Sequence, residues 1–129
     1  MYPSTHSNAL RVISGMAQGW DTLAARTAID LGIPYIAAVP WIGFSSNWPG
    51  EHQHLYLDLL EKAERVEIIC DTQVYQPWVY QKRDEWMVDN SDLLCSAWDG
   101  VREGGTWNTI KYALKKNRRD QILSVYERP

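Results

Sequence analysis

The feature that most constrains the fold is a regular alternation of short β-rich runs with amphipathic helical patterns. The expected strands are residues 11–14, 35–39, 66–70, 92–98 and 121–126. The expected helices between them are residues 20–31, 49–64, 77–90 and 106–116. Strands that alternate with helices favour right-handed crossovers and a mainly parallel sheet with helices on both faces. We therefore predict a three-layer α/β sandwich with a sheet of about five strands.

Residues 35–39 form a run that is apolar throughout, which is typical of a strand buried on both faces of a parallel sheet. Pro40 is expected to end this strand, because proline has no N–H to donate. In such sheets ligands bind outside the carboxyl ends of the strands. The first two strands end at Ser14 and next to Trp41, so we expect a ligand site near these residues.

Composition excludes several classes of protein. The 129 residues suffice for a single domain over 1–129, and 45% hydrophobic with 22% charged residues opposes disorder. A net charge of −3 makes nucleic-acid binding unlikely as a general function. No apolar stretch is long enough for a membrane span, and the polar start MYPSTHSNAL lacks the blocks of a signal peptide. We expect a cytoplasmic protein with no membrane partner.

The first glycine-rich turn, residues 15–19, joins a predicted strand to a predicted helix. Gly15 and Gly19 can adopt backbone angles, or allow close approaches, that a Cβ would prevent. The N terminus of the following helix supplies unpaired N–H groups and a partial positive charge, which suit a phosphate. The alternative is a tight connector in which Asp21 caps the helix.

A second glycine site, residues 103–109, also lies after a strand and before a helix, so the two helix N termini should converge on one edge of the sheet. Thr106 and Asn108 can bond a phosphate or a sugar hydroxyl, and both also suit helix capping. Asp99 and Glu103 can serve as acid or base, or bind a ribose hydroxyl. A valine at Gly15 or at Gly105 is expected to weaken ligand binding more than tenfold and to leave the fold intact.

Other candidates carry less weight. A planar ring can stack on Trp41, Trp48, Trp98 or Trp107, although Trp98 and Trp107 also suit helix-on-sheet packing. We expect no metal site, because the two histidines that follow Glu51 point to different faces of a helix. We also expect no cofactor and no disulfide.

Three segments of the chain resemble the SLOG superfamily of Rossmann-like domains. They are SGMAQGWDTLAARTAIDLGIPYIAAVP, WMVDNSDLLCSAWDG and GGTWNTIKYA, and the resemblance runs from about Val12 to Ala113. The chain resembles the short YpsA-like and phage-encoded members, and more distantly the DNA-processing protein DprA and the Lonely-Guy phosphoribohydrolases. Such proteins are thought to bind nucleotides or nucleotide-derived ligands across the two glycine loops. The resemblance implies a bacterial or phage source and ligand contacts at Ser14, Gly15, Gln18, Gly19, Asp21, Asp99, Gly104, Gly105 and Thr106.

The chain departs from the phosphoribohydrolase pattern Pro-Gly-Gly-x-Gly-Thr-x-x-Glu, in which the final Glu is catalytic. Glu103 replaces the proline, Trp107 the later glycine and Lys111 the catalytic Glu. We therefore predict binding of a nucleotide or nucleoside phosphate. The alternatives are a nucleoside monophosphate N-glycosidase with Asp99 or Glu103 as its carboxylate, and a structural or inhibitory interaction protein with a degenerate pocket.

Relatives usually begin with a strand and a Gly-His-Arg-Pro-like loop, and from the resemblance we expect this chain to start after them. We expect that strand to lie between the strands at 11–14 and 66–70, so its absence would leave backbone groups unpaired. A start of the gene product further upstream, direct pairing of the two strands, or association of copies can each resolve this. We predict a homodimer or larger oligomer, because seven Trp and seven Tyr offer anchors for an interface.

Overall fold

The strand at the centre of the fold is β2 (Tyr35–Trp41), which is buried from its first residue to Pro40. It pairs in parallel with β1 (Val12–Ser14) on one side and with β3 (Arg65–Cys70) on the other. The structure is a computed structural model that describes residues 10–97, 100–116 and 122–124. A strand with two paired edges and two covered faces has no place for a charged side chain, which explains its uniformly apolar sequence.

Pro40 does not end this strand, contrary to the prediction from sequence, and β2 continues to Trp41. The pairing with β1 stops where Ser14 lies opposite Ala37. In the pairing with β3, Val39 lies opposite Ile68 and Trp41 lies opposite Cys70, while Pro40 between them has no paired residue. Proline is tolerated here because no ladder hydrogen bond requires its missing N–H.

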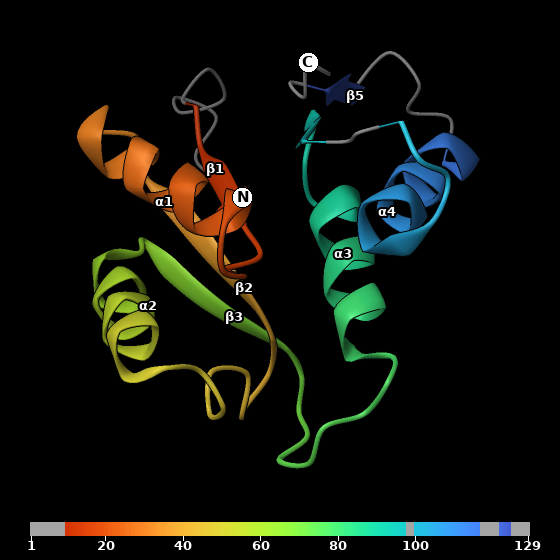
Figure 1. Ribbon diagram of the computed structural model, residues 1–129. Coiled ribbons are helices and arrows are strands. Elements are labelled where there is room, and N and C mark those ends of the chain that lie inside the picture. The colour runs from red at the N-terminus through yellow and green to blue at the C-terminus, as the bar shows by residue number, and fades with distance from the viewer. Residues whose placement is uncertain (1–9, 98–99, 117–121, 125–129) are drawn as a thin grey trace.

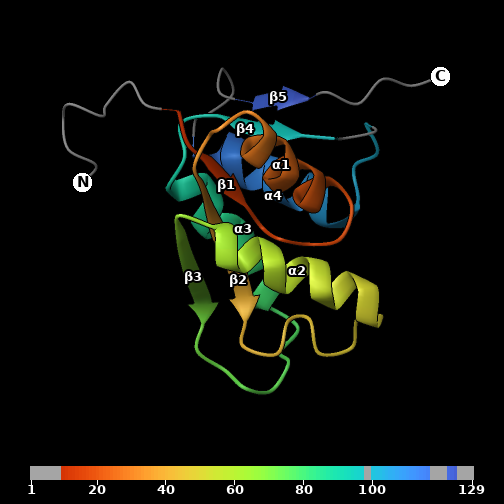
Figure 2. The same cartoon turned by 90° about the vertical axis from the view of Figure 1, so that its left-hand side faces the viewer.

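Helices cover both faces of this sheet. They are α1 (Trp20–Asp30), α2 (Gly50–Lys62), α3 (Val79–Asp89) and α4 (Gly104–Lys115). Figure 1 shows α1 and α2 on one face and α3 on the other, with α4 packed on α3, and Figure 2 shows α1 and α2 in front of the strands. The predicted three-layer, Rossmann-like α/β arrangement is confirmed. Within the described part of the chain, no helix is both long enough and apolar enough to cross a membrane.

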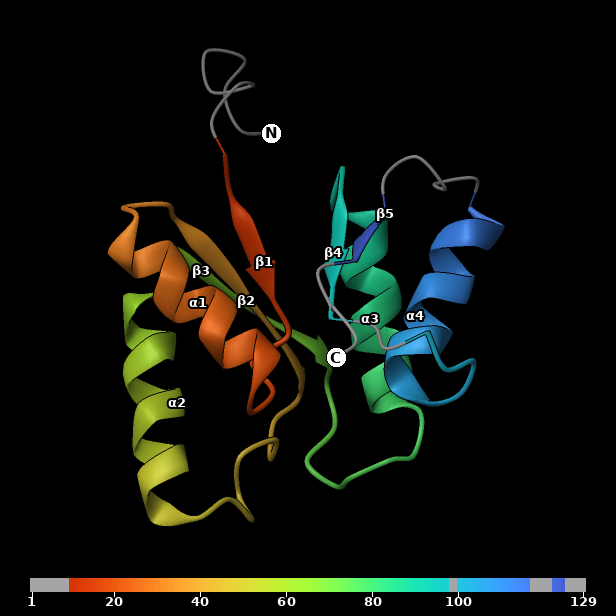
Figure 3. The same cartoon turned by 45° about the horizontal axis from the view of Figure 1, so that its top comes forward.

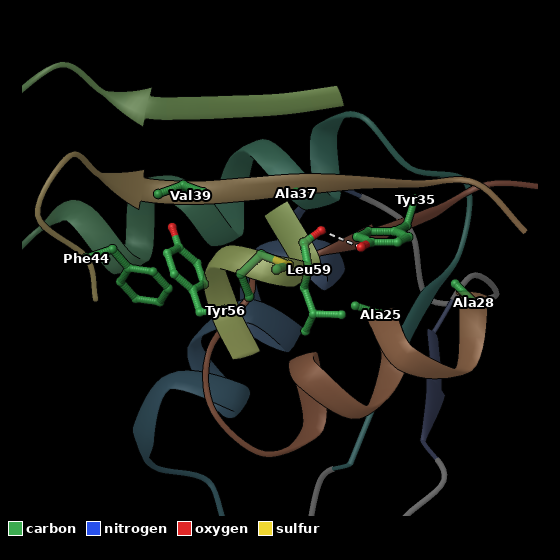
Figure 4. Close-up of a cluster of buried hydrophobic side chains, with 9 residues drawn as sticks. Ala25, Ala28, Tyr35, Ala37, Val39, Phe44, Tyr56 and Leu59 are labelled. Carbon is green, nitrogen blue, oxygen red and sulfur yellow. Dashed lines mark hydrogen bonds between the residues drawn. The ribbon is translucent and has the colours of Figure 1, made fainter. Parts of the chain in front are cut away.

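The main core lies between β2 and the helices α1 and α2 (Figure 4). Small residues of α1, Ala25 and Ala28, let that helix approach the strand closely, whereas α2 contributes the larger Tyr56 and Leu59. The hydroxyl of Tyr35 donates a hydrogen bond to the carbonyl oxygen of Leu59, so the polar end of this buried ring is satisfied.

The predicted single sheet of about five strands is instead divided into two. The strands β4 (Leu94–Ser96) and β5 (Ile122–Ser124) form a separate parallel pair. Within the described residues, β1 and β4 each bond to a strand on one side only, and Figure 3 shows them at the facing edges of the two sheets. Both strands have only three residues, and neither is hydrogen-bonded to the other.

The prediction of a gap between the strands at 11–14 and 66–70 is wrong. The strand β2 lies between them and pairs with both. These two strands therefore do not pair directly either. Among the described residues, β1 and β3 are the edge strands of one sheet, and β4 and β5 each pair on one side only in the other. Association of copies remains a prediction.

Candidate functional site

The loop between β1 and α1 is held by hydrogen bonds of its own side chains. The buried hydroxyl of Ser14 donates to the carbonyl oxygen of Asp21 at 2.8 Å and accepts from the N–H of Met16 at 3.1 Å. The carboxylate of Asp21 accepts from the N–H of Ala17 at 3.3 Å. Met16 has a φ of 63° and a buried side chain, an uncommon combination for a residue with a Cβ. Such backbone strain persists only where the surroundings fix it, and it occurs often at functional sites.

A buried cation, Arg83 of α3, lies against this loop. Its side chain is 7% exposed, and its guanidinium donates to the carbonyl oxygen of Gly15 and, at 2.7 Å, to the carboxylate of Asp84. The rings of Phe44 and Tyr80 lie 5.8 Å and 5.9 Å from the guanidinium carbon. One carbonyl, one carboxylate and two aromatic rings therefore compensate for the burial of the charge.

Arg83 was not among the residues that the sequence predicts for the site. It lies four residues after Val79 and five before Val88, and both valines are buried on α3. Its position among the buried residues of a helix is the sequence signal that could have identified Arg83, because arginine is rarely buried without a partner.

The absence of a side chain at Gly15 leaves room for the ends of two other side chains. A Cβ on Gly15 would lie 2.8 Å from Nη1 of Arg83 and 2.8 Å from Oδ2 of Asp21. The close approach predicted at this glycine is therefore real, but it is an approach of the protein's own side chains. A valine at Gly15 would displace the ends of these two side chains, so we expect it to lower the stability of the protein as well as its affinity for a ligand.

The carboxyl group of Asp21 is the titratable group of this loop whose pKa is clearly shifted. Burial raises its pKa above the ordinary value of 3.8, and the negative charge of Asp84 adds to the increase. The charge of Arg83 and the hydrogen bond from Ala17 oppose this increase. The carboxyl group consequently keeps its proton to a higher pH than an exposed aspartate does.

The second loop, before α4, is open. Glu103 is the N-cap residue and makes no side-chain capping bond, and neither Thr106 nor Asn108 supplies one. Gly104 has a φ of 89°, and a Cβ on it or on Gly105 would meet nothing within 4 Å. The residues predicted as ligand contacts here, Gly104, Gly105, Thr106 and Asn108, are all exposed. Asp99 and Trp98 lie outside the described residues.

One hydrogen-bonded network connects the two loops. Thr109 of α4 donates to Oδ2 of Asp84 at 3.0 Å, while Oδ1 of Asp84 binds Arg83, which in turn binds Gly15. The structure thus brings Ser14, Gly15 and Asp21 together directly. It connects them to α4 through α3.

Other predicted residues lie elsewhere. Gln18 and Gly19 are exposed at the start of α1, where Gly19 has a φ of 91°. Trp48 is partly buried and packs edge-on against Phe44, at 5.0 Å between ring centroids, so its ring packs against the core. An open groove between α3 and α4 is lined by Gln81, Asn108, Lys111, Tyr112, Leu114 and Lys115. The described residues contain no group of three or more side chains suited to a metal ion.

Comparison with known proteins gives a family for most of the chain. The family model YpsA, described as YspA SLOG family, matches residues 4–126. The chain is 28% identical over 137 residues to an uncharacterized SPbeta prophage-derived protein, YoqJ, of Bacillus subtilis (strain 168), which covers 95% of this chain and 80% of that protein.

Two further relatives are longer than this chain. It is 26% identical over 110 residues to the UPF0398 protein BBR47_29830 of Brevibacillus brevis, which covers 81% of this chain and 58% of the relative. It is 25% identical over 91 residues to the UPF0398 protein SH1465 of Staphylococcus haemolyticus, which covers 67% of this chain and 49% of the relative. The chain thus spans about half the length of these two relatives.

Proposed function

Because the chain belongs to the YspA SLOG family, we propose that it binds a nucleotide or another nucleoside phosphate at the loops before α1 and α4. The observation that carries the proposal is the free N terminus of α1 beside the strained loop. The N–H groups of Gly19, Trp20 and Asp21 have no hydrogen-bond partner among the described residues. Unpaired amides at a helix N terminus are suited to a phosphate.

The charges of the site suggest which protein groups would bind the phosphate and which would bind the sugar of the ligand. The cluster of Asp21, Arg83 and Asp84 contains two acids and one base, and the base is already paired. The phosphate is therefore assigned to the backbone amides at the start of α1, where the carboxyl group of Asp21 is already bonded to the N–H of Ala17. Asp21 is assigned to a sugar hydroxyl, because a carboxylate readily accepts a hydrogen bond from such a group.

The α4 side of the site offers the sharpest test. Gly105→Val places a side chain in open space, so we expect native stability and a more than tenfold loss of affinity for the nucleoside monophosphates AMP, GMP, CMP and UMP. Gly50→Val is the matched control, because Gly50 begins another helix and a Cβ there also meets nothing within 4 Å. Isothermal titration calorimetry measures both.

Two results would contradict the proposal. Wild-type protein that binds none of the four monophosphates would overturn it outright. Equal losses in Gly105→Val and Gly50→Val would remove the α4 loop from the site, because Gly50 begins a different helix, α2.

The N-glycosidase alternative rests on Asp99 or Glu103 as the carboxylate. Glu103 is exposed, and Lys111 lines the groove between α3 and α4 at the position where the phosphoribohydrolases have a Glu. We expect little release of free base from nucleoside monophosphates. Turnover that is robust in the wild type and lost in Glu103→Gln would favour the enzyme.

A further inference from the structure

The outer edge of β3 is the longest unpaired strand edge in the described part of the chain. The strand runs from Arg65 to Cys70 and pairs with β2 on one side only, whereas β1, β4 and β5 have 3 residues each. Figure 2 shows β3 at the margin of the molecule, with no other labelled element on its outer side. An unpaired edge presents a row of N–H and C=O groups that can pair with another strand.

The face of β3 that continues the main core is apolar but uncovered. Val66 lies opposite Ala37 of β2, and Ile68 lies opposite Val39, so these four side chains share one face of the sheet. Ala37 and Val39 are 0% and 2% exposed in the core with α1 and α2, whereas Val66 is 41% exposed and Ile68 is 51% exposed. The helices therefore cover the central strand and leave the apolar side chains of the edge strand open to a partner.

The charged side chains of β3 leave this apolar face free. Arg65 and Glu67 alternate with the apolar residues, so they lie on the opposite face of the sheet. Nε of Arg65 is 2.9 Å from Oε1 of Glu67, so the two charges compensate each other within the strand. Edge strands often carry lysine or proline that prevents further pairing, and β3 contains neither. This edge is therefore suited to another strand that is apolar on the same face.

We propose that β3 pairs antiparallel with β3 of a second copy of this chain, so that the sheets of the two copies become one continuous sheet. A twofold axis that uses the same edge in both copies makes the two strands antiparallel and closes the assembly as a dimer. The inference involves no residue of the proposed nucleoside-phosphate site and does not depend on it.

The sequence of β3 favours one register for this pairing. Residues that lie opposite each other must share a face of the sheet, so the twofold axis passes beside a single residue. An axis at Glu67 would put two glutamates directly opposite each other, which is unfavourable. An axis at Val66 or Ile69 would leave half of β3 unpaired. An axis at Ile68 avoids both problems and pairs residues 66–70 of the two copies.

This register makes the strand complementary to itself. Val66 of one copy lies opposite the partner's Cys70, and Ile68 lies opposite the partner's Ile68, so the half-exposed apolar side chains of both copies cover one another. Arg65 and the partner's Asp71 stand at each end of the pairing, where their opposite charges favour association. The second copy supplies these features by symmetry, which favours it over an unrelated strand.

The experiment measures the oligomeric state of the full chain by light scattering and sedimentation over a range of concentrations. We expect a concentration-dependent equilibrium between monomer and dimer. Ile68→Lys and Ile68→Glu each put two like charges opposite each other across the axis, so each should weaken the dimer at least about tenfold. Leu23→Lys and Leu23→Glu are the matched controls, because Leu23 is 55% exposed on α1. Each control should stay within about twofold of the wild type.

A mixture of the two Ile68 variants tests the register and the folding of both proteins together. When Ile68→Lys and Ile68→Glu are mixed in equal amounts, a lysine of one chain lies opposite a glutamate of the other. We therefore expect a heterodimer about as stable as the wild-type dimer, although neither variant associates well with itself. A misfolded variant could not restore the dimer in this way.

Four results would overturn the proposal. The first is a wild-type chain that stays monomeric at every concentration. The second is an equal loss of association in the Ile68 variants and in the Leu23 controls, because the interface would then lie elsewhere. The third is a mixture of the Ile68 variants that associates no better than either variant alone, which excludes pairing about Ile68. The fourth is an assembly that keeps growing beyond the dimer, because a closed twofold contact cannot do so.

Discussion

The two glycine loops have the same sequence context, a glycine-containing turn between a strand and a helix, but the structure uses them in opposite ways. At the first loop, Gly15 is buried and its missing side chain makes room for Arg83 and Asp21. At the second loop, Gly104 and Gly105 are exposed and a Cβ on either would meet nothing within 4 Å. The first glycine serves the internal packing of the protein, and the second pair leaves a helix N terminus accessible.

This difference shows what a glycine before a helix means. The residue can be needed for backbone conformation, for contacts within the protein or for contact with a ligand, and only the surroundings distinguish the three. Gly104 belongs to the first kind because of its φ of 89°, and Gly15 belongs to the second. Gly105 has neither constraint, so it is free to make the ligand contact that we propose.

The largest expected effect separates Gly15 from Gly105. Gly15→Val should lower the free energy of unfolding by about 4 kcal/mol, because it combines overpacking with loss of a charge-assisted hydrogen bond. Gly105→Val should change it by less than about 1 kcal/mol, because the space is open. Urea denaturation measures both. Equal destabilisation by the two variants would abolish the distinction between the loops.

The next effect tests whether Arg83 holds the first loop. Arg83→Leu should cost about 2 to 3 kcal/mol, less than Gly15→Val, since it removes the bond to the Gly15 carbonyl without a clash and Asp84 keeps its bond from Thr109. Lys62→Leu is a control that removes an exposed cation paired with Asp58, with an expected change below about 0.5 kcal/mol. An Arg83→Leu protein as stable as the control would mean that the buried cation does not support the loop.

Within the second loop, we expect alanine substitutions at the two adjacent glycines to change stability by smaller amounts and in opposite directions. Gly104→Ala should destabilise by about 1 kcal/mol because alanine is strained at a φ of 89°. Gly105→Ala should stabilise by about 0.5 kcal/mol, because alanine has the higher helix propensity and its methyl group meets nothing. Thermal and urea denaturation of this adjacent pair give the sign directly. Two losses of similar size would show that Gly105 also has a structural role.

The smallest effect is a pH dependence confined to the first loop. Because the pKa of Asp21 is raised in the folded state, the folded protein binds this proton more tightly than the unfolded chain does. Its contribution to stability is therefore full below pH 3.8 and is lost as the pH rises through the raised pKa.

Asp21→Asn should remove this loss, so the stability of the variant relative to the wild type should increase across that window and then become constant. Urea denaturation at several pH values measures the difference. Glu103→Gln, which removes an exposed carboxyl from the second loop, is the matched control. A relative stability of Asp21→Asn that falls with pH would mean that the folded protein favours the ionised form.

Local patterns in the sequence determined the elements and their order. The apolar run before Pro40 became the buried central strand, and helical periodicity placed α1, α2, α3 and α4 within a few residues of their observed bounds. These features depend on neighbours in the chain, because strand burial and helical faces repeat every two or 3.6 residues. The motifs that carry the SLOG resemblance are also local, and they identified the family that the comparisons show.

Only the tertiary structure decided which elements are neighbours and which side chains meet across them. It placed β2 between β1 and β3, divided the expected sheet, and brought Arg83 of α3 to Gly15, which lies 68 residues earlier in the chain. It also showed that the rings of Trp41 and Trp48 both pack against the core, and that the indole N–H of Trp41 has no acceptor among the described residues. Strand order and such contacts depend on packing between segments far apart in sequence, and the periodicity of any one segment carries no information about its partner.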